Sequence, residues 1–372
     1  MMKRWAILLC GLALVVSTVG AQDAGTPRHF HLGFTPFPYD ISVEAVNYSY
    51  ETIAANADMI VHHFDNGVPW VEALSGEPFS AHIMDDWNYR KEHTPEELTV
   101  FLTLTPISIN RDGLAPYRGT ADDMPLPAPW DSYNFDDPNV KTAFLNYVLR
   151  AVDFFQPDYL AIGIESNLLL NNAPEKWDAY LELHHYVYAE VKAQHPDLPV
   201  MATLFGLAFL DGYRGEDDHQ AQMAAFEDII AYSDYFAVSL YPYMSKYMTA
   251  YIPPEMFDDL FSLSDKPLAI SETGYPAQTF SIFNDTLVFE STPEKQAAYI
   301  ESVLAEAEAR QLAFVVNFVL RDYDALWEKI GGGDLATVWR DTGLFDEDGG
   351  ARPALEAWRA ALARPYEPAT PQ

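Results

Sequence analysis

The segments Tyr159-Leu160-Ala161-Ile162-Gly163-Ile164-Glu165 and Pro267-Leu268-Ala269-Ile270-Ser271-Glu272 decide the fold expected for this chain. Each is an apolar run that ends in a glutamate. Apolar runs without strict alternation are typical of strands that are buried on both faces of a parallel sheet. Because such a strand is buried, each glutamate is expected at the exposed carboxyl end of its strand.

Six further runs of this kind bring the number of predicted strands to eight. They are His29–Phe34, Met59–Phe64, Leu98–Leu104, Pro199–Leu204, Tyr235–Tyr241 and Ala313–Leu320. Amphipathic helical patterns lie between strands, for example from Trp177 to Val191 and from Ile300 to Ala307. Strands that alternate with helices over about 340 residues predict an α/β fold, the (β/α)8 TIM barrel.

The chain is expected to form one domain, residues 22–364, because no linker divides it. Three long segments are predicted as loops at the C-terminal face of the strands, namely Ser75–Glu97, Arg111–Pro138 and Pro242–Asp265. The segment 365–372 is predicted to be a flexible tail.

Residues 1–21 resemble a secretory signal peptide. A short basic start and an apolar run from Trp5 to Val16 are followed by small residues up to Ala21. We therefore expect a secreted or periplasmic protein without stable membrane insertion after leader removal, because no later stretch reaches the roughly 18 apolar residues of a membrane helix. The single cysteine, Cys10, lies in this leader, so no thiol chemistry is expected in the mature protein.

The composition is strongly acidic. The chain has 55 Asp+Glu against 22 Lys+Arg and a formal net charge of −33. This balance argues against nucleic acid as a partner, because phosphate binding requires Lys and Arg gathered on one face. Aromatic residues make up 14% of the chain, which fits a carbohydrate-binding surface as well as a large core.

Glu165 and Glu272 close the fourth and seventh predicted strands, where a barrel of this kind carries its reactive groups. Two carboxyl groups that face each other across a cleft can split a glycosidic bond. One protonates the leaving oxygen, while the other attacks the anomeric carbon or activates water. This chemistry requires no metal and no other cofactor, and it makes a carbohydrate the expected substrate.

Three motifs carry a resemblance to a known family. They are Ser271-Glu272-Thr273-Gly274-Tyr275-Pro276, Ser239-Leu240-Tyr241-Pro242-Tyr243, and Thr342-Gly343-Leu344-Phe345-Asp346 with the following Gly349-Gly350 and Arg352-Pro353-Ala354-Leu355. They resemble the strand-7, strand-6 and C-terminal motifs of the endo-β-1,4-galactanase family in clan A of the glycoside hydrolases.

The resemblance implies a (β/α)8 barrel and retaining hydrolysis of a polysaccharide or oligosaccharide. It implies that Glu272 is the nucleophile and Glu165 the acid/base. Tyr241 would hydrogen-bond the nucleophile, and Trp327, after strand 8, would form a platform for a sugar ring. As a general acid, Glu165 is expected to have a raised pKa, whereas Glu272 is expected to stay ionised.

Two positions depart from the family pattern. Clan A enzymes usually carry Asn before the strand-4 glutamate, and this chain has Ile164 there, which leaves Asn167 as the candidate substitute. They also tend to carry Arg on strand 2, where this chain has His62-His63-Phe64-Asp65.

Further residues are candidates for contact with the substrate. Because side chains alternate along a strand, only one of His62 and His63 can face the barrel interior, and His63 is kept as the candidate. Asp65 follows the second strand, Asn110 follows the third, and Tyr275 follows the expected nucleophile.

Two other functions stay open at this point. The strand-end histidines and carboxylates could bind a divalent cation, although these residues show no His-x-His or Glu-x-x-His spacing. A non-catalytic glycan-binding protein on a glycosidase scaffold is the second alternative, because a fold alone does not establish a reaction.

Overall fold

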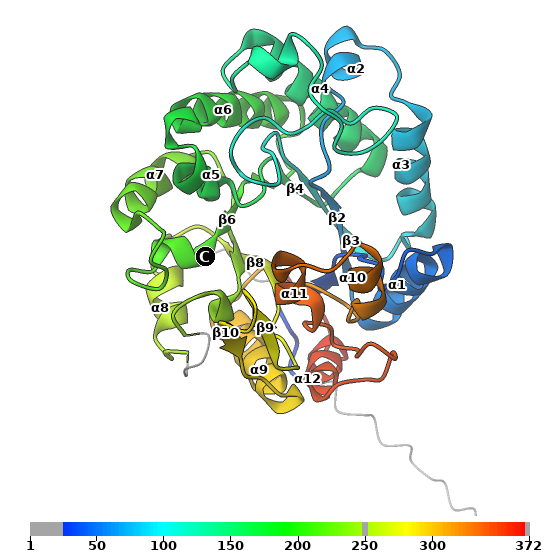
Figure 1. Cartoon of the computed structure of the whole chain (residues 1–372), viewed down its shortest axis with the longest axis vertical. Coiled ribbons are helices and arrows are strands. Elements are labelled where there is room, and N and C mark those ends of the chain that lie inside the picture. The colour runs from blue at the N-terminus through cyan, green and yellow to red at the C-terminus, as the bar shows by residue number, and fades with distance from the viewer. Residues whose placement is uncertain (1–24, 248–251, 369–372) are drawn as a thin grey trace, which may run out of the picture.

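The computed structural model describes residues 25–247 and 252–368. The expected signal peptide, with Cys10, lies outside the described residues. The described chain forms a ring of parallel strands with helices around it (Figure 1). No helix among the described residues is both long and apolar enough to cross a bilayer.

Within the described residues, the ring has eight strand positions. Its strands are β1 (His31–Phe34), β2 (Met59–Phe64), β3 (Thr99–Leu104), β4 (Tyr159–Ala161), β5 (Val200–Met201), β6 (Thr203–Phe205), β7 (Phe236–Leu240), β8 (Leu268–Thr273) and β11 (Phe314–Asn317). Neighbours follow the order β5-β4-β3-β2-β1-β11-β8-β7-β6. Only Ala202 separates β5 from β6, so both ends of this order belong to one interrupted strand and the sheet closes. The predicted (β/α)8 TIM barrel is confirmed.

Helices cover the outside of the ring and part of its mouth (Figure 1). They are α1 (Val43–Asn56), α2 (Trp70–Ser75), α3 (Ala81–His93), α4 (Pro138–Phe155), α5 (Leu169–Asn172), α6 (Trp177–Gln194), α7 (His219–Ala231), α8 (Met256–Phe261), α9 (Pro293–Ala309), α10 (Asp324–Lys329), α11 (Asp334–Arg340) and α12 (Pro353–Leu362). An antiparallel hairpin, β9 (Phe280–Ile282) and β10 (Leu287–Phe289), follows β8.

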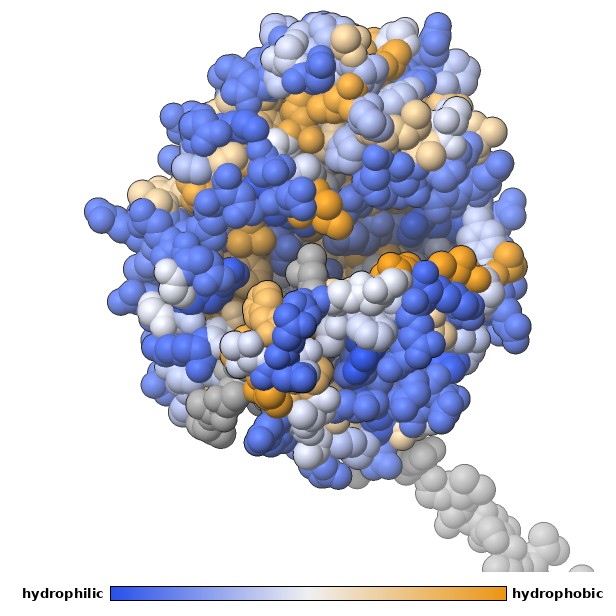
Figure 2. All heavy atoms as spheres, viewed as in Figure 1, coloured by the Kyte–Doolittle hydropathy of each residue, from blue (hydrophilic) through white to orange (hydrophobic). Residues whose placement is uncertain are grey.

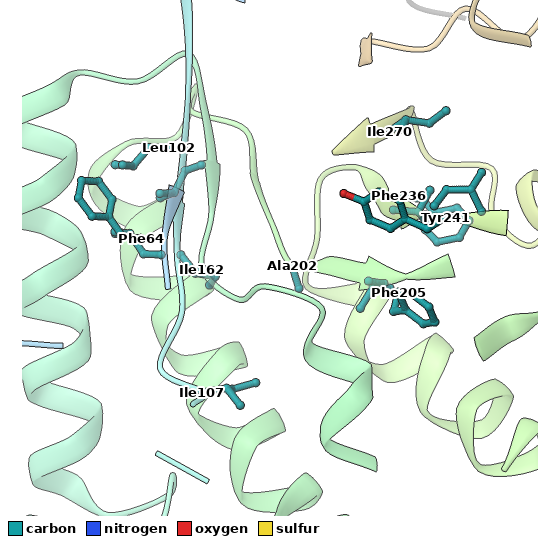
Figure 3. Close-up of a cluster of buried hydrophobic side chains, with 14 of the residues drawn as sticks. Phe64, Leu102, Ile107, Ile162, Ala202, Phe205, Phe236, Tyr241 and Ile270 are labelled. Carbon is teal, nitrogen blue, oxygen red and sulfur yellow. The ribbon is translucent and has the colours of Figure 1, made fainter. Parts of the chain in front are cut away.

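The hydrophobic core has two layers, because each strand is covered on both faces. The inner layer fills the barrel with Met59, Val61, Phe101, Ala161, Met201, Ala237, Ala269, Phe314 and Val316, all of them buried. The outer layer lies between the strands and the helices, and Figure 3 shows part of it, including Phe64, Leu102, Ile162, Phe236 and Ile270. This covering explains why the strands are apolar runs in the sequence.

Two of the predicted loops contain α-helices. Helix α3 lies within Ser75–Glu97 and begins at Ala81, after the N-cap residue Ser80, whose hydroxyl accepts a hydrogen bond from the Ile83 backbone N–H. Only Ile83 and Trp87 of this helix are buried, so its apolar periodicity is weak. Helix α8 lies within Pro242–Asp265. The segment Arg111–Pro138 contains one short 3-10 helix, Trp130–Ser132, and no α-helix before α4 begins at Pro138.

Two predicted boundaries also differ from the structure. Strand β4 ends at Ala161, and the chain continues to Glu165 in an irregular path. The start of the predicted tail is fixed, because the backbone N–H groups of Arg28 and Glu367 donate to Pro365 and Arg28, respectively. The Tyr366 ring also packs against His31 at 4.1 Å. Residues 369–372 lie outside the described residues.

The Phe314→Ala variant tests the inner layer. Phe314 is fully buried and its ring lies 5.0 Å from those of Phe101 and Tyr159. Removing the ring leaves a cavity that its neighbours on different strands cannot fill, so we expect a loss of about 3–5 kcal/mol in the free energy of unfolding. Urea unfolding measures this loss. Val288→Ala on the exposed hairpin is the control, and an equal loss in both variants would contradict the two-layer core.

Candidate active site

A β-bulge in β8 directs Glu272 toward the barrel mouth. Ala269 lies in the inner layer and Ile270 in the outer layer, so strict alternation would turn Glu272 outward. The register shifts, however: Val238 of β7 pairs with Ile270, and the next residue, Ser239, pairs with Glu272. One extra residue, Ser271, thereby reverses the direction of the side chains beyond it.

Glu165 reaches the same mouth by a different route. Its backbone lies in the left-handed region, with φ 45° and ψ 42°, and its N–H donates to the hydroxyl of Thr203 at 3.1 Å. Gly163 permits this path, because a Cβ there would lie 2.4 Å from both the Ser166 and the Tyr180 hydroxyl oxygens. These two hydroxyls are hydrogen-bonded to each other at 2.6 Å.

Ser239 of β7 and Tyr241, which directly follows β7, each hydrogen-bond one of the two carboxyl groups. Tyr241 donates its hydroxyl to Glu272 Oε1 at 2.5 Å, which is the contact that the resemblance implied. The Ser239 hydroxyl hydrogen-bonds Glu165, and Ser239 is the register partner of Glu272. Because neighbouring strands lie about 4.8 Å apart, this shared partner brings the two glutamates together at one end of the barrel.

A buried arginine, Arg111, lies beside the carboxyl pair. Its guanidinium forms two parallel hydrogen bonds with Asp65, at 3.0 and 2.7 Å, and Nη2 lies 3.7 Å from Glu165 Oε2. The exposed fraction of the Arg111 side chain is 7%, whereas that of Glu165 is 20%. Glu165 is thus the more accessible of the two groups.

The mouth of the barrel is hollowed. Figure 2 shows a recess in the middle of this face, and in the same view Figure 1 shows the strand ends there, with α10 and α11 on one side. Glu165 and Glu272 are both only partly buried. Both carboxyl groups are therefore partly accessible at this end of the barrel.

Burial raises the pKa of both carboxyl groups. The pKa of Glu272 rises to about 8, because burial and the neighbouring Glu165 charge outweigh the hydrogen bond from Tyr241 and the charge of Arg111. Burial also raises the pKa of Glu165, although Arg111 opposes this rise. Two adjacent carboxylates do not both ionise readily, which favours a proton on the pair. The raised pKa of Glu165 agrees with the expectation for a general acid. The raised pKa of Glu272 differs from the expectation that Glu272 stays ionised.

The two histidines of β2 point in opposite directions, as predicted. His63 is paired in register with Thr103, whose hydroxyl lies 3.1 Å from His63 Nδ1. Burial lowers the pKa of His63 to about 4, so the ring is neutral near Asp65 and Arg111. His62 packs on the outer side against Phe155 and contacts Thr94. His63 stays a candidate for substrate contact.

Several other candidates lie in positions that give no support for contact with substrate. The amide of Asn167 is buried between the backbone of Phe205 and the side chain of Gln222. Asn110 is exposed on a turn, and Tyr275 is buried in an aromatic cluster with Tyr299.

Trp327 is half-buried on α10. Its indole N–H donates to the Thr337 hydroxyl at 3.0 Å, and the Arg340 guanidinium lies 5.2 Å from the ring centre. These contacts fix the indole, but they do not show that it faces the recess.

Three residues that lie close to the candidate residues were not singled out from the sequence, namely Arg111, Phe318 and Trp339. Arg111 follows the candidate Asn110 directly, so the signal was one residue away. Phe318, half-buried, directly follows β11 and lies edge-to-face with Phe37 at 5.2 Å. Trp339 of α11 contacts the Tyr241 ring at 6.1 Å, and its buried indole N–H has no hydrogen-bond partner among the described residues.

A cluster of carboxylates lies apart from Glu165 and Glu272. Ligand atoms of Asp322, Asp324 and Glu347 lie within 4.8 Å of one another. Arg352 donates to Asp322 and lies 3.9 Å from Glu347, and the Gly343 N–H donates to Asp322 as well. An arginine therefore already compensates this negative charge. None of the strand-end residues proposed for a metal belongs to this cluster.

No protein-family model and no curated protein sequence matches the chain. Solved structures do match. A GH5_18 protein from Bifidobacterium longum subsp. longum has a TM-score of 0.63 and 17% identity, over 92% of this chain and 82% of that chain. An exo-β-1,4-mannosidase from Opitutaceae bacterium strain TAV5 has a TM-score of 0.61 and 13% identity, over 92% and 61%.

A fungal β-1,4-galactanase is also similar, with a TM-score of 0.53 and 17% identity over 85% of this chain and 90% of that chain. At these identities the likeness concerns the fold. The chain has the barrel fold of these glycoside hydrolases, and the resemblance to a galactanase-type barrel is confirmed at that level.

Gly163→Ala tests the backbone path to Glu165. The added methyl group has to displace the Ser166–Tyr180 pair, so we expect a loss of about 1–3 kcal/mol in the free energy of unfolding. Gly215→Ala is the matched control, because a Cβ at Gly215 meets nothing within 4 Å. Urea unfolding of both variants decides the matter, and equal stability would show that Gly163 is not required for this path.

Glu272→Gln tests the cost of burying the carboxyl pair. A group whose pKa rises on folding, here from 4.5 to about 8, loses stability as pH increases through this interval, because the unfolded state releases its proton first. The glutamine variant avoids this cost. It should match wild type near pH 4 and exceed it by about 1–3 kcal/mol near pH 8.

Thermal and urea unfolding across this pH range measure the difference between wild type and Glu272→Gln. The exposed Glu301→Gln variant controls for the loss of one negative charge from an acidic protein. A Glu272→Gln variant that gains nothing over this control near pH 8 would contradict the raised pKa.

Proposed function

We propose that this protein is a retaining glycoside hydrolase in which Glu165 acts as acid/base and Glu272 as nucleophile. The observation that carries the proposal is the close carboxyl pair in the recess at the barrel mouth. Ser239 links the two groups, and Tyr241 holds Glu272. Retaining enzymes hold their two carboxyl groups about 5–5.5 Å apart. Two groups that both contact the end of β7, one of which raises the pKa of the other by its charge, fit this requirement.

The geometry supports a two-step reaction. In the first step, Glu272 attacks the anomeric carbon while the shared proton passes from Glu165 to the leaving oxygen. The hydroxyl of Tyr241 keeps the attacking carboxylate in place. In the second step, Glu165 takes a proton from water while the water oxygen bonds to the anomeric carbon and displaces the Glu272 carboxylate, which releases the sugar. The pair therefore begins and ends the cycle with one proton.

The substrate is proposed to be a β-linked oligosaccharide or polysaccharide. Support comes from the similar solved proteins, which include an exo-β-1,4-mannosidase and a β-1,4-galactanase. Mannosides and galactosides with β-1,4 linkages are thus the first substrates to test. We also propose that the protein is secreted or periplasmic, on the basis of the sequence of residues 1–21.

The kinetic test uses aryl β-glycosides and β-1,4-linked oligosaccharides. Glu272→Gln should lower kcat/KM by about 1,000-fold or more on every substrate, because no nucleophile remains. Glu165→Ala should lose about 100- to 10,000-fold on oligosaccharides but far less on dinitrophenyl glycosides, whose leaving group needs no proton. Glu301→Gln is the control. Proton NMR of the first product should show the β-anomer.

Three results would contradict the proposal. An inverted product would remove the nucleophilic role of Glu272. Activity that survives Glu272→Gln would place the chemistry elsewhere. A wild type that binds oligosaccharides, detected by calorimetry, but cleaves none of the panel would identify a non-catalytic glycan-binding protein.

A further inference from the structure

The turn after β3 delivers a buried positive charge to the acid/base carboxyl. Arg111 has a left-handed backbone, with φ 53°, and it is buried. Nη1 donates to Asp65 and to the Ser108 carbonyl, both at 3.0 Å, and Nη2 donates to Asp65 at 2.7 Å. Nη2 also lies 3.7 Å from Glu165 Oε2.

The same turn is attached to the segment that follows Glu165. Within the turn, the Ser108 N–H donates to the Gly113 carbonyl at 2.9 Å. From the other segment, Asn172 donates to the Asn110 carbonyl at 2.8 Å, and Lys176 donates to the Asp112 carbonyl at 2.6 Å. Two side chains that follow Glu165 thus bind the backbone of the turn that carries Arg111, so Arg111 and Glu165 are held relative to each other by hydrogen bonds as well as by charge.

We propose that Asp65 and Arg111 form a positioning pair for the acid/base Glu165. Arg111 orients the carboxyl group and stabilises it when it is ionised, as the second step requires. Asp65 compensates the arginine, so that Glu165 can still carry a proton for the first step. This inference rests on the proposed function. It gives Asp65 and Arg111 a role in positioning Glu165 that does not follow from the barrel fold or from the two glutamates alone.

The charge balance around Glu165 explains why both members are needed. An uncompensated arginine at this distance typically lowers the pKa of a carboxyl group by one unit or more, about 1–3. Such a shift would strip the proton from a general acid at neutral pH. In the structure, the charges of Arg111 and Asp65 act on the pKa of Glu165 in opposite directions, so Asp65 offsets part of the effect of Arg111.

Other groups also face Glu165. Glu272 on β8 opposes its ionisation, and Ser239 on β7 favours it through a hydrogen bond. Arg214, on the loop between β6 and α7, favours ionisation as well, although it is engaged by Glu216. The neutral His63 is near enough for the charges of Asp65 and Arg111 to act on its pKa. Substitutions in the Asp65–Arg111 pair can therefore either lower or raise the pKa of Glu165.

The test compares the pH dependence of kcat/KM in three variants. Asp65→Asn leaves Arg111 uncompensated and should move the alkaline limb down by about one pH unit or more. Arg111→Gln leaves the Asp65 charge and should move the limb up. The double variant should return the limb toward the wild-type position. A purely structural ion pair predicts lower stability in each variant but no opposite shifts.

Asp58→Asn is the matched control. Asp58 precedes β2, at the opposite end of the strand that Asp65 follows, and it pairs with the buried Arg28 at 2.5 Å. The substitution removes the same charge from a comparable pair, so it should lower stability without moving the limb. Asp65→Glu and Arg111→Lys, which keep the charges, serve where the first variants do not fold, and both should leave the limb close to that of wild type.

A second measurement does not depend on turnover. Carbon-13 NMR of protein labelled at the glutamate carboxyl groups, in a Glu272→Gln background, follows the titration of Glu165 directly. Its midpoint should fall in Asp65→Asn and rise in Arg111→Gln. A midpoint and a limb that stay in place, or that move in the same direction, would overturn the positioning role alone. A wild type without any hydrolysis would overturn the proposed function, whatever the titration shows.

Discussion

The cost of burying two negative charges side by side governs the site. Neither Glu165 nor Glu272 is fully exposed, and the charge of Glu165 raises the pKa of Glu272. Partial burial makes the free energy of ionisation high unless donors and cations offset it. The Tyr241 hydroxyl, the Ser239 hydroxyl and the Arg111 guanidinium supply this offset. The same burial that is costly to the fold keeps a transferable proton in the recess at neutral pH.

Much of the fold was predictable because parallel strands with two covered faces are apolar runs, and all eight strand positions were found. The two glutamates were identified for the same reason, since each closes such a run. The helix α3 was missed, because it buries only Ile83 and Trp87 and so lacks a clear apolar stripe.

The contacts that position the two glutamates were harder to predict from the sequence. The bulge at Ser271 has no signal in an apolar run, because strict alternation would turn Glu272 the other way. Arg111 was missed because its role depends on a turn that brings it back to Asp65, a residue 46 positions earlier. Asn167 was proposed for the site from its distance to Glu165 along the chain, whereas its amide joins Phe205 to Gln222. Contacts between distant segments decide these cases, and spacing alone does not reveal them.

The backbone pairing of Arg28 with Pro365 and Glu367 has a practical consequence for engineering. These residues lie beside the start of β1, at the amino ends of the strands, whereas the carboxyl pair lies at the opposite ends. A short peptide bridge between residues 28 and 365 would therefore span only a small gap. Such a bridge would allow circular permutants with new termini elsewhere on the surface. A carrier domain or surface tether fused near residues 28 and 365 would lie at the opposite end of the barrel from the carboxyl pair and would leave access to that pair open.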